Sequence, residues 1–326
     1  MGQPKVDPLP SGIDLNGKTA VVTGASAGLG LETARQLLRL GCSTMVLAVR
    51  NVAKGESCAQ ELQQDPAIKA RKPTIKVLKF DADRYDSVQD FAKALQRDVP
   101  VVHILVLNAG IGCLKMERSS TGHEQALQIN YLSNVLLLAE LLPYLEASAD
   151  KSGSPTRITW VGSRKHDGGI SFESKAPLGA EESVLERMNS EEKYVPWCRY
   201  ADSKLLCAMF MYSLAPRLDK EKIILNMVCP GMISTGISAF LPLHIRLLFN
   251  VLFFVRARSA EVGGWLIINA AVVAGPESHG RHLGDKQILD VSEYIQSSAG
   301  QSFQKKLWVE TMEEMKKFTV LPLEFR

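Results

Sequence analysis

Short apolar runs alternate with amphipathic stretches along most of the chain. The runs are rich in β-branched residues and are bounded by turn residues, which predicts buried strands. We expect these strands at residues 18–23, 44–49, 75–80, 101–107, 157–161 and 223–228. We expect helices at residues 31–40, 52–64, 86–97, 121–147 and 260–274, and one around Tyr200. Nearly continuous apolar strands that alternate with helices indicate an α/β fold, a doubly wound parallel sheet with helices on both faces.

The two ends of the chain differ from its centre. Residues 1–16 are rich in proline and lack the apolar core of a secretory signal, which predicts an extended arm. Residues 17–285 are expected to form a single α/β domain. Residues 286–326 are expected to form a helical tail, with an amphipathic stretch from Phe303 to Phe318.

Composition narrows the class of protein. Of 326 residues, 46% are hydrophobic and 22% are charged, which is typical of a soluble globular protein. The net charge of +3 is too small to predict nucleic-acid binding. The six cysteines lack metal-type or redox spacing, and the sequence has no Asn-x-Ser/Thr sequon. We therefore expect a reducing, cytoplasmic location and no metal site.

The first strand runs directly into a glycine-rich turn and a helix. Gly24, Gly28 and Gly30 follow Thr23 in the spacing Gly-x-x-x-Gly-x-Gly. Glycines let the backbone approach a pyrophosphate, and the helix N-terminus supplies N–H donors. This segment predicts a phosphate-binding loop, with a ligand-free glycine turn as the alternative.

A cation follows the second strand where an acidic residue would favour NAD. Arg50 lies twenty positions after Gly30, and Lys54 follows one helical turn later. Basic side chains there suit a ribose 2′-phosphate, so NADP is favoured over NAD. A solvated helix start is the alternative. Because parallel strands end at one edge, Gly24, Arg50, Asp81 and Asn108 are expected on the same rim.

Tyr200 and Lys204 form a candidate acid/base pair. Residues four apart share one face of a helix, and an ammonium near a phenol lowers its pKa. A proton-transfer group works best when its pKa approaches the working pH. On its own the pair is also compatible with a solvated helix face.

Taken in order, the glycine loop, Asn108-Ala109-Gly110, Asn130, Ser163, the Tyr200/Lys204 pair and Pro230-Gly231 resemble the short-chain dehydrogenase/reductase family. The resemblance covers residues 17–285 and implies a Rossmann-like fold. Fungal secondary-metabolism members and retinol-dehydrogenase-like members look most similar. The departures are Leu107 and Gly162, where the family usually has Asn and Ser, and neither removes a catalytic residue.

The resemblance assigns roles to four side chains. Tyr200 would donate the proton in reduction, and Lys204 would lower the pKa of Tyr200 and hold the nicotinamide ribose. Ser163 would bind the substrate oxygen, and Asn130 would hold a water that links Lys204 to solvent. Cofactor contacts are expected at Gly24, Ser26, Gly28, Leu29, Gly30, Arg50, Asn51, Lys54, Asp81, Ala82, Asn108, Ala109, Gly110, Tyr200, Lys204, Pro230, Gly231, Ile233 and Thr235.

Two insertions vary within the family, at residues 164–199 and 236–258. The first is expected to be a lid over the site or a surface loop. In the second, residues 237–255 are rich in Phe and Leu but are interrupted by Pro242, His244 and Arg246. A substrate lid is favoured there, with an interfacial membrane helix and a protein interface as alternatives.

These features predict an NADPH-dependent oxidoreductase, a ketoreductase or alcohol dehydrogenase, acting on a bulky apolar ketone or secondary alcohol in fungal secondary metabolism. The expected partner is this small molecule, and nucleic acid is not expected. A homo-oligomer is left open, and peripheral membrane contact is the less favoured alternative. Two rival functions stay open. One is non-redox chemistry on the same fold, as an isomerase, dehydratase or cyclase, and the other is a non-catalytic, cofactor-bound scaffold.

Overall fold

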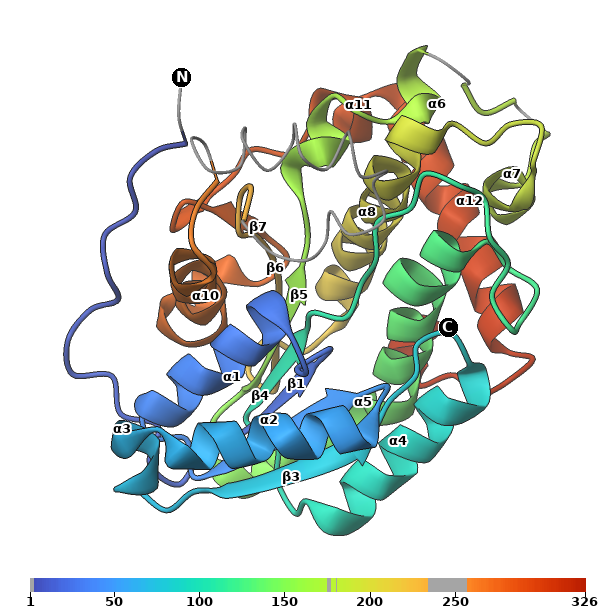
Figure 1. The fold of residues 1–326 in the computed structure, drawn as a ribbon. Helices are drawn as coiled ribbons and strands as arrows, with labels where there is room; N and C mark the ends of the chain where they lie inside the picture. Colours follow the sequence, from blue (N-terminus) through green and yellow to red (C-terminus); the bar gives the residue numbers. More distant parts are fainter. Residues whose placement is uncertain (1–2, 175–176, 180, 234–256) are drawn as a thin grey trace.

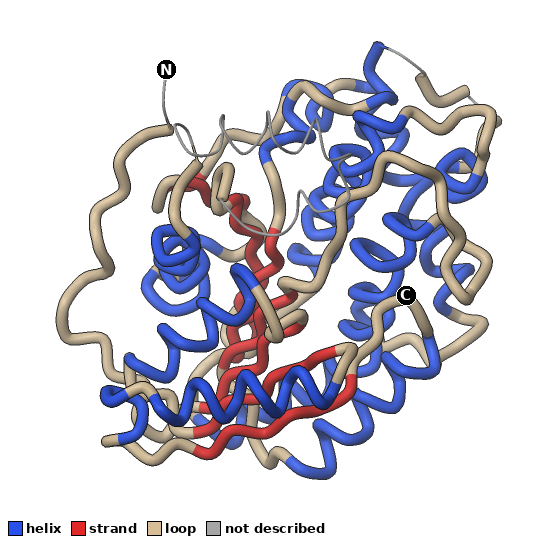
Figure 2. The backbone as a smooth tube through the Cα atoms, in the orientation of Figure 1, coloured by secondary structure: helices blue, strands red, loops and turns tan. Residues whose placement is uncertain are grey.

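The computed structural model describes residues 3–174, 177–179, 181–233 and 257–326. Its centre is an eight-stranded sheet in the order β3-β2-β1-β4-β5-β6-β7-β8, shown in red in Figure 2. Within this described sheet every neighbouring pair is parallel except β7 and β8. The strands are β1 (Thr19–Thr23), β2 (Thr44–Val49), β3 (Thr74–Lys79), β4 (Ile104–Leu107), β5 (Thr156–Val161), β6 (Ile223–Cys229), β7 (His282–Gly284) and β8 (Gln287–Ile288). The prediction of a doubly wound α/β fold is confirmed.

Helices cover both faces of the sheet (Figure 1). One face carries α1 (Gly28–Arg39), α2 (Val52–Gln64) and α10 (Ala260–Ile268), whose apolar residues share a core with β1 and β2. The other carries α4 (Tyr85–Asp98), α5 (Ser133–Ser152) and α8 (Pro196–Leu214), which pack with α12 (Ser298–Met315) in a second core. The short helices are α3 (Pro66–Lys69), α6 (Ser171–Ser174), α7 (Val184–Asn189) and α11 (Glu293–Gln296). The remaining helical turns are η1 (Leu127–Leu132), η2 (Arg164–Asp167), η3 (Ala215–Arg217), η5 (Asn269–Val273), η6 (Pro276–Ser278) and η7 (Leu323–Phe325).

The helix expected at residues 121–147 is shifted and contains a wider turn. Residues 118–124 instead form a tight bend. Gly122 has φ +89° there, and the main chains of Arg118 and Glu124 form an isolated antiparallel β-bridge. The π-helical turn η1 then precedes α5, which continues to Ser152 and ends at Gly153 in the left-handed conformation. Apolar periodicity alone did not reveal these local main-chain bonds.

The insertion at residues 164–199 packs into the core of the α8 face. Phe172, Val184 and Met188 are buried, and the Phe172 ring meets Phe303 of α12 at a centroid distance of 4.8 Å. The Glu310 carboxylate of α12 accepts hydrogen bonds from the Ser183 hydroxyl at 2.8 Å and from the first main-chain N–H groups of α7. The C-terminal helix therefore fastens this insertion to the body of the protein.

Of the second insertion, residues 236–258, the structure describes only residues 257–258. Residues 237–255, for which a lid, a membrane helix and an interface were weighed, lie outside the described residues. Among helices within the described ranges, none has the length and apolarity needed to cross a bilayer.

A buried carboxylate ties the first insertion to α8. Asp202 accepts hydrogen bonds from the Ser171 N–H at 2.6 Å and from its hydroxyl at 2.8 Å. Burial raises the pKa of Asp202 to about 6, although the Ser171 bonds and the charges of Arg199 and Arg187 lower it. An aspartate in an unfolded chain has a pKa of about 3.9. The folded state therefore binds this proton more tightly, and the stabilisation it provides below about pH 4 is lost as the pH rises to about 6.

We predict that Asp202→Asn keeps both contacts and removes this pH dependence, because an amide can accept from the Ser171 N–H and donate to its hydroxyl. Between about pH 4 and pH 6 the variant should gain up to roughly 3 kcal/mol of unfolding free energy relative to the wild type. Urea denaturation across this range measures it, with Asp90→Asn at an exposed position as the control. A stability difference that does not change with pH would contradict the prediction.

Candidate active site

The expected site residues lie where the parallel strands end. Thr23 ends β1, Asn108 follows β4, Ser163 follows β5 and Pro230 follows β6. Because these neighbouring strands are parallel, their ends share one edge of the sheet. The structure thereby brings together segments that are far apart in the sequence.

A hydrogen-bonded junction of β1 and β4 shapes the glycine loop. The Thr23 hydroxyl accepts from the main-chain N–H groups of Asn108 and Ala109, each at 2.9 Å. The Asn108 amide donates back to the Thr23 carbonyl at 2.8 Å. Gly24 and Gly28 have φ +69° and +53°, a region that favours glycine. A Cβ at Gly30 would collide with the Asn108 amide and the Gly24 carbonyl, so the turn requires glycine there too.

The N-terminus of α1 faces this turn without a side-chain cap. Its N-cap residue is Ala27, whose side chain supplies no capping hydrogen bond, and the first turn has no acidic residue. Free N–H donors and a positive dipole end make such a terminus an anion site. The glycine turn and the uncapped helix fit a dinucleotide pyrophosphate, which the NADP(H) prediction requires.

The rim at β2 and β3 carries the other expected cofactor contacts. Arg50 is exposed directly after β2, and within the described residues no hydrogen bond or ion pair engages its side chain. Asn51 caps α2 by accepting from the Lys54 N–H at 3.0 Å. After β3, the half-buried Asp81 side chain accepts from the Asp83 N–H at 3.2 Å. Arg50 is therefore available to a ligand at this rim.

Tyr200 and Lys204 both lie on α8 and face the end of β5. Lys204 is buried, its Nζ donates to the Val161 carbonyl at 2.8 Å, and it lies 5.7 Å from the centre of the Tyr200 ring. Burial lowers the pKa of Lys204. Burial raises the pKa of Tyr200, while the nearby Ser163 hydroxyl lowers it. The net shift in the pKa of Tyr200 is therefore opposite to the one expected from the Tyr/Lys spacing.

Ser163 is held by the turn that follows it. Its hydroxyl accepts from the Lys165 N–H at 3.2 Å as the N-cap of η2. Its carbonyl accepts from His166 Nδ1 at 2.5 Å, and the His166 ring stacks on His282 at 5.2 Å. These contacts fix the main chain of Ser163 beside Tyr200.

Asn130 lies inside the π-helical turn η1 and is fully buried. Its amide oxygen accepts from the Ile111 N–H at 2.8 Å, and its amide nitrogen donates to the Ile111 carbonyl and the Ser203 hydroxyl, each at 2.9 Å. The side chain thus joins the segment after β4 to α8. A water held for Lys204 stays a prediction.

The loop after β6 completes this edge. Gly231 has φ +82°, and Ile233 is buried. Thr235, the last expected cofactor contact, lies outside the described residues. Sequence reasoning gave no role to Thr23, His166 or Asp202. For Thr23 a signal existed, because a polar residue at the end of a buried strand needs a hydrogen-bond partner.

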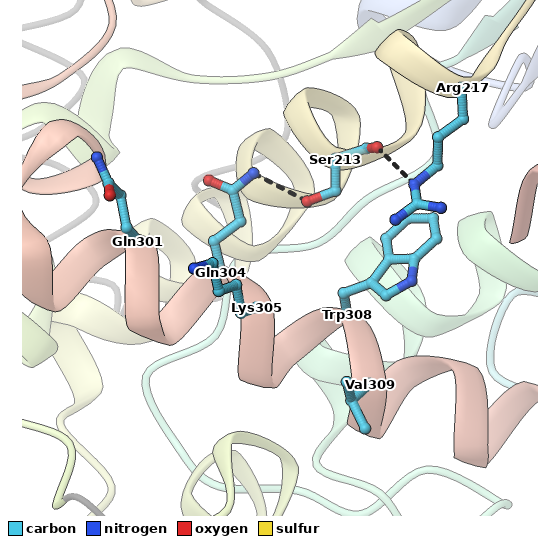
Figure 3. Close-up of a pocket in the computed structure, with 7 residues that line it drawn as sticks. All are labelled: Ser213, Arg217, Gln301, Gln304, Lys305, Trp308 and Val309. Atoms are coloured by element: carbon cyan, nitrogen blue, oxygen red, sulfur yellow. Dashed lines mark hydrogen bonds between the residues drawn. The ribbon is translucent and has the colours of Figure 1, made fainter. Parts of the chain in front are cut away.

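A separate groove lies away from this edge, between α8 and α12 (Figure 3). It has a volume of about 460 Å³, and it is lined by Ser213, Arg217, Gln301, Gln304, Lys305, Trp308 and Val309. Arg217 stacks on Trp308 at 4.5 Å and donates to the Ser213 carbonyl, which leaves its charge partly satisfied. None of the expected site residues lines the groove.

Solved structures with this fold include an uncharacterized protein from Mycobacterium paratuberculosis, with a TM-score of 0.66 and 24% identity over 95% of this chain and 97% of that one. Another is the RhlG/NADP active-site complex from Pseudomonas aeruginosa, with a TM-score of 0.63 and 21% identity over 85% of this chain and 97% of that one. At these identities the likeness concerns the fold alone.

Sequence relatives are much closer. Residues 18–169 match the family model described as short chain dehydrogenase. The short chain dehydrogenase yanD of Aspergillus niger is 62% identical, and macD of Penicillium terrestre is 61% identical, each over 99% of this chain and 98% of the relative. The reductase tropG of Talaromyces stipitatus is 56% identical over the same shares. Identity at this level along nearly the whole length means that the chain belongs to the short-chain dehydrogenase/reductase family.

Proposed function

We propose that the chain is an NADPH-dependent oxidoreductase that interconverts a bulky apolar ketone and its secondary alcohol in fungal secondary metabolism. The observation that carries the proposal is the arrangement around Tyr200, with the Lys204 ammonium buried beside its ring and Ser163 close enough to lower the pKa of its phenol. This arrangement stands at the strand edge where the glycine loop and α1 offer a pyrophosphate site.

In the reductive direction the chain's residues handle the oxygen and the proton. Bound NADPH would supply the hydride. Ser163 and Tyr200 would donate hydrogen bonds to the carbonyl oxygen, where negative charge develops, and Tyr200 would transfer its proton to that oxygen. The Lys204 ammonium would stabilise the resulting phenolate until solvent returns the proton. Oxidation of the alcohol runs through the same groups in reverse.

Two features support an apolar substrate. Trp197 precedes Tyr200 by three residues on α8, which places both on one face of the helix, and it is 60% exposed. The Phe- and Leu-rich residues 237–255 follow the Pro230–Ile233 loop in sequence. The rival functions predict something different, because neither a non-redox enzyme of the same fold nor a scaffold needs hydride transfer.

We predict that Tyr200→Phe lowers turnover by roughly 10²-fold or more, the usual size of general acid catalysis. NADPH affinity should be retained, because the ring remains. Tyr212→Phe, at a half-buried position on the same helix, is the matched control and should keep its turnover. NADPH oxidation with a panel of ketones measures both variants. If Tyr200→Phe retains full turnover, the proton donor lies elsewhere and a non-redox or scaffold function gains support.

We predict that Arg50→Asp lowers NADPH affinity by roughly one to two orders of magnitude, because a charge-assisted pair worth about 1.5–3 kcal/mol is lost. NADH binding should be unchanged or improved, since Asp can accept from a ribose hydroxyl. Titration calorimetry with both cofactors measures this. Lys93→Asp, an exposed position on α4, makes the same charge change away from the rim. Equal affinity of the wild type for NADH and NADPH would refute the cofactor preference.

A further inference from the structure

The N-terminal arm reaches the active-site edge of the sheet. From the start of β1 it runs along the outer side of α10 toward the ends of β6 and β7 (Figure 1). Along this path, Val6, Leu9 and Ile13 pack against the core that α1, α2 and α10 share with β1 and β2. The arm therefore has a fixed course that ends next to the Pro230–Ile233 loop.

Gln3 pairs with that loop as a neighbouring strand would. Its amide oxygen accepts from the Met232 N–H at 2.7 Å, and its amide nitrogen donates to the Met232 carbonyl at 2.8 Å. A Cβ at Gly231 would collide with the Gln3 amide oxygen and approach the Arg258 guanidinium at 2.8 Å. The contact thus requires a glycine at position 231, quite apart from its φ of +82°.

Arg258 joins the arm, the loop and the β7–β8 turn. Its guanidinium donates to the Pro4 carbonyl at 2.7 Å and to the Pro230 carbonyl at 3.4 Å, and it pairs with Asp285 at 2.6 Å. Its main-chain N–H donates to the Met232 carbonyl at 2.9 Å. The side chain is 8% exposed, and a buried guanidinium needs such partners in fixed directions.

Lys286 holds the arm a few residues further along. Its Nζ donates to the carbonyls of Asp7 and Pro8 at 2.6 and 2.8 Å. Asp285 and Lys286 are the two positive-φ residues of the β7–β8 turn, with φ +52° and +65°. One tight turn therefore anchors both the arm and the arginine that contacts the loop.

We propose that the arm is a positioning element for the nicotinamide end of the cofactor site, acting through Gln3 and Arg258 on the Pro230–Ile233 loop. The inference rests on the proposed function and on the cofactor contacts expected at Pro230, Gly231 and Ile233. This loop follows β6, which pairs with β5, and the end of β5 holds Lys204, the residue expected to bind the nicotinamide ribose. A loop fixed in its binding conformation before the ligand arrives loses less conformational entropy on binding. The predicted 2′-phosphate contact, Arg50, follows β2, which is separated from β6 by β1, β4 and β5 in the sheet. We therefore expect the effect of the arm at the opposite end of the cofactor.

The test compares two ligands. Gln3→Ala should weaken NADPH binding by about 3–10-fold, as expected for the loss of two hydrogen bonds that order a loop. Binding of adenosine 2′,5′-bisphosphate, which lacks the nicotinamide half, should not change. Lys5→Ala, at an exposed position of the same arm, should change neither. Arg258→Lys keeps the positive charge but loses the several N–H donors of the guanidinium. This variant should remain folded, bind NADPH more weakly and bind adenosine 2′,5′-bisphosphate unchanged.

The outcomes separate the inference from its premise. Equal losses for both ligands in Gln3→Ala would indicate general destabilisation and overturn the positioning role, as would unchanged NADPH affinity. Hydrogen exchange at the Met232 amide, measured without ligand, should be faster in Gln3→Ala. If that exchange is faster but NADPH affinity is unchanged, the arm contact exists without the proposed role. If the wild type binds neither cofactor, the proposed function itself fails, and this inference fails with it.

Discussion

The buried ammonium of Lys204 is the constraint on which the site depends. An ammonium has three donors, and taking it out of water is costly unless they find acceptors. One donor reaches the Val161 carbonyl at the end of β5, which fixes α8 against the sheet. This single bond sets the position of Tyr200 opposite Ser163, because the phenol lies one helical turn before the lysine and the serine lies two residues beyond Val161. In the proposed function, the other two donors of this ammonium would bind the nicotinamide ribose and the Tyr200 phenolate.

Much of the fold could be predicted from the apolar pattern. Buried parallel strands are nearly continuous apolar runs, and the helices between them have clear periodicity, so the parallel sheet and its helical layers could be expected. The boundaries around residues 118–132 could not be predicted in the same way. The bend at Gly122 and the π-helical turn that holds Asn130 depend on hydrogen bonds to Ile111 and Ser203, which are distant in sequence. The family resemblance singled out Asn130, but it gave no geometry for the turn that holds this side chain.

In the candidate site, too, the short-range features could be predicted and the long-range contacts could not. Short-range motifs could indicate the glycine loop and the Tyr200/Lys204 pair, since their chemistry lies within a few residues. The supports around these motifs come from remote segments: Glu310 of α12 caps α7, Asp202 of α8 holds Ser171, and the Thr23 hydroxyl accepts from the Asn108 N–H. No spacing rule connects such partners. The pKa of Tyr200 shows the same limit, because the burial that raises it comes from the whole fold and not from the motif.

The arm contacts join residues at opposite ends of the chain. Gln3 and Met232 are 229 positions apart, and Lys286 and Asp7 are 279 positions apart. Closing a loop of that size in an unfolded chain costs more conformational entropy than closing a β–α–β unit, and the cost grows with the logarithm of its length. A few hydrogen bonds cannot offset that cost unless the sheet has already brought the segments together. The N-terminal arm therefore has little stability of its own. Any change that weakens the pairing of β6 with β7 also weakens the contacts of the arm.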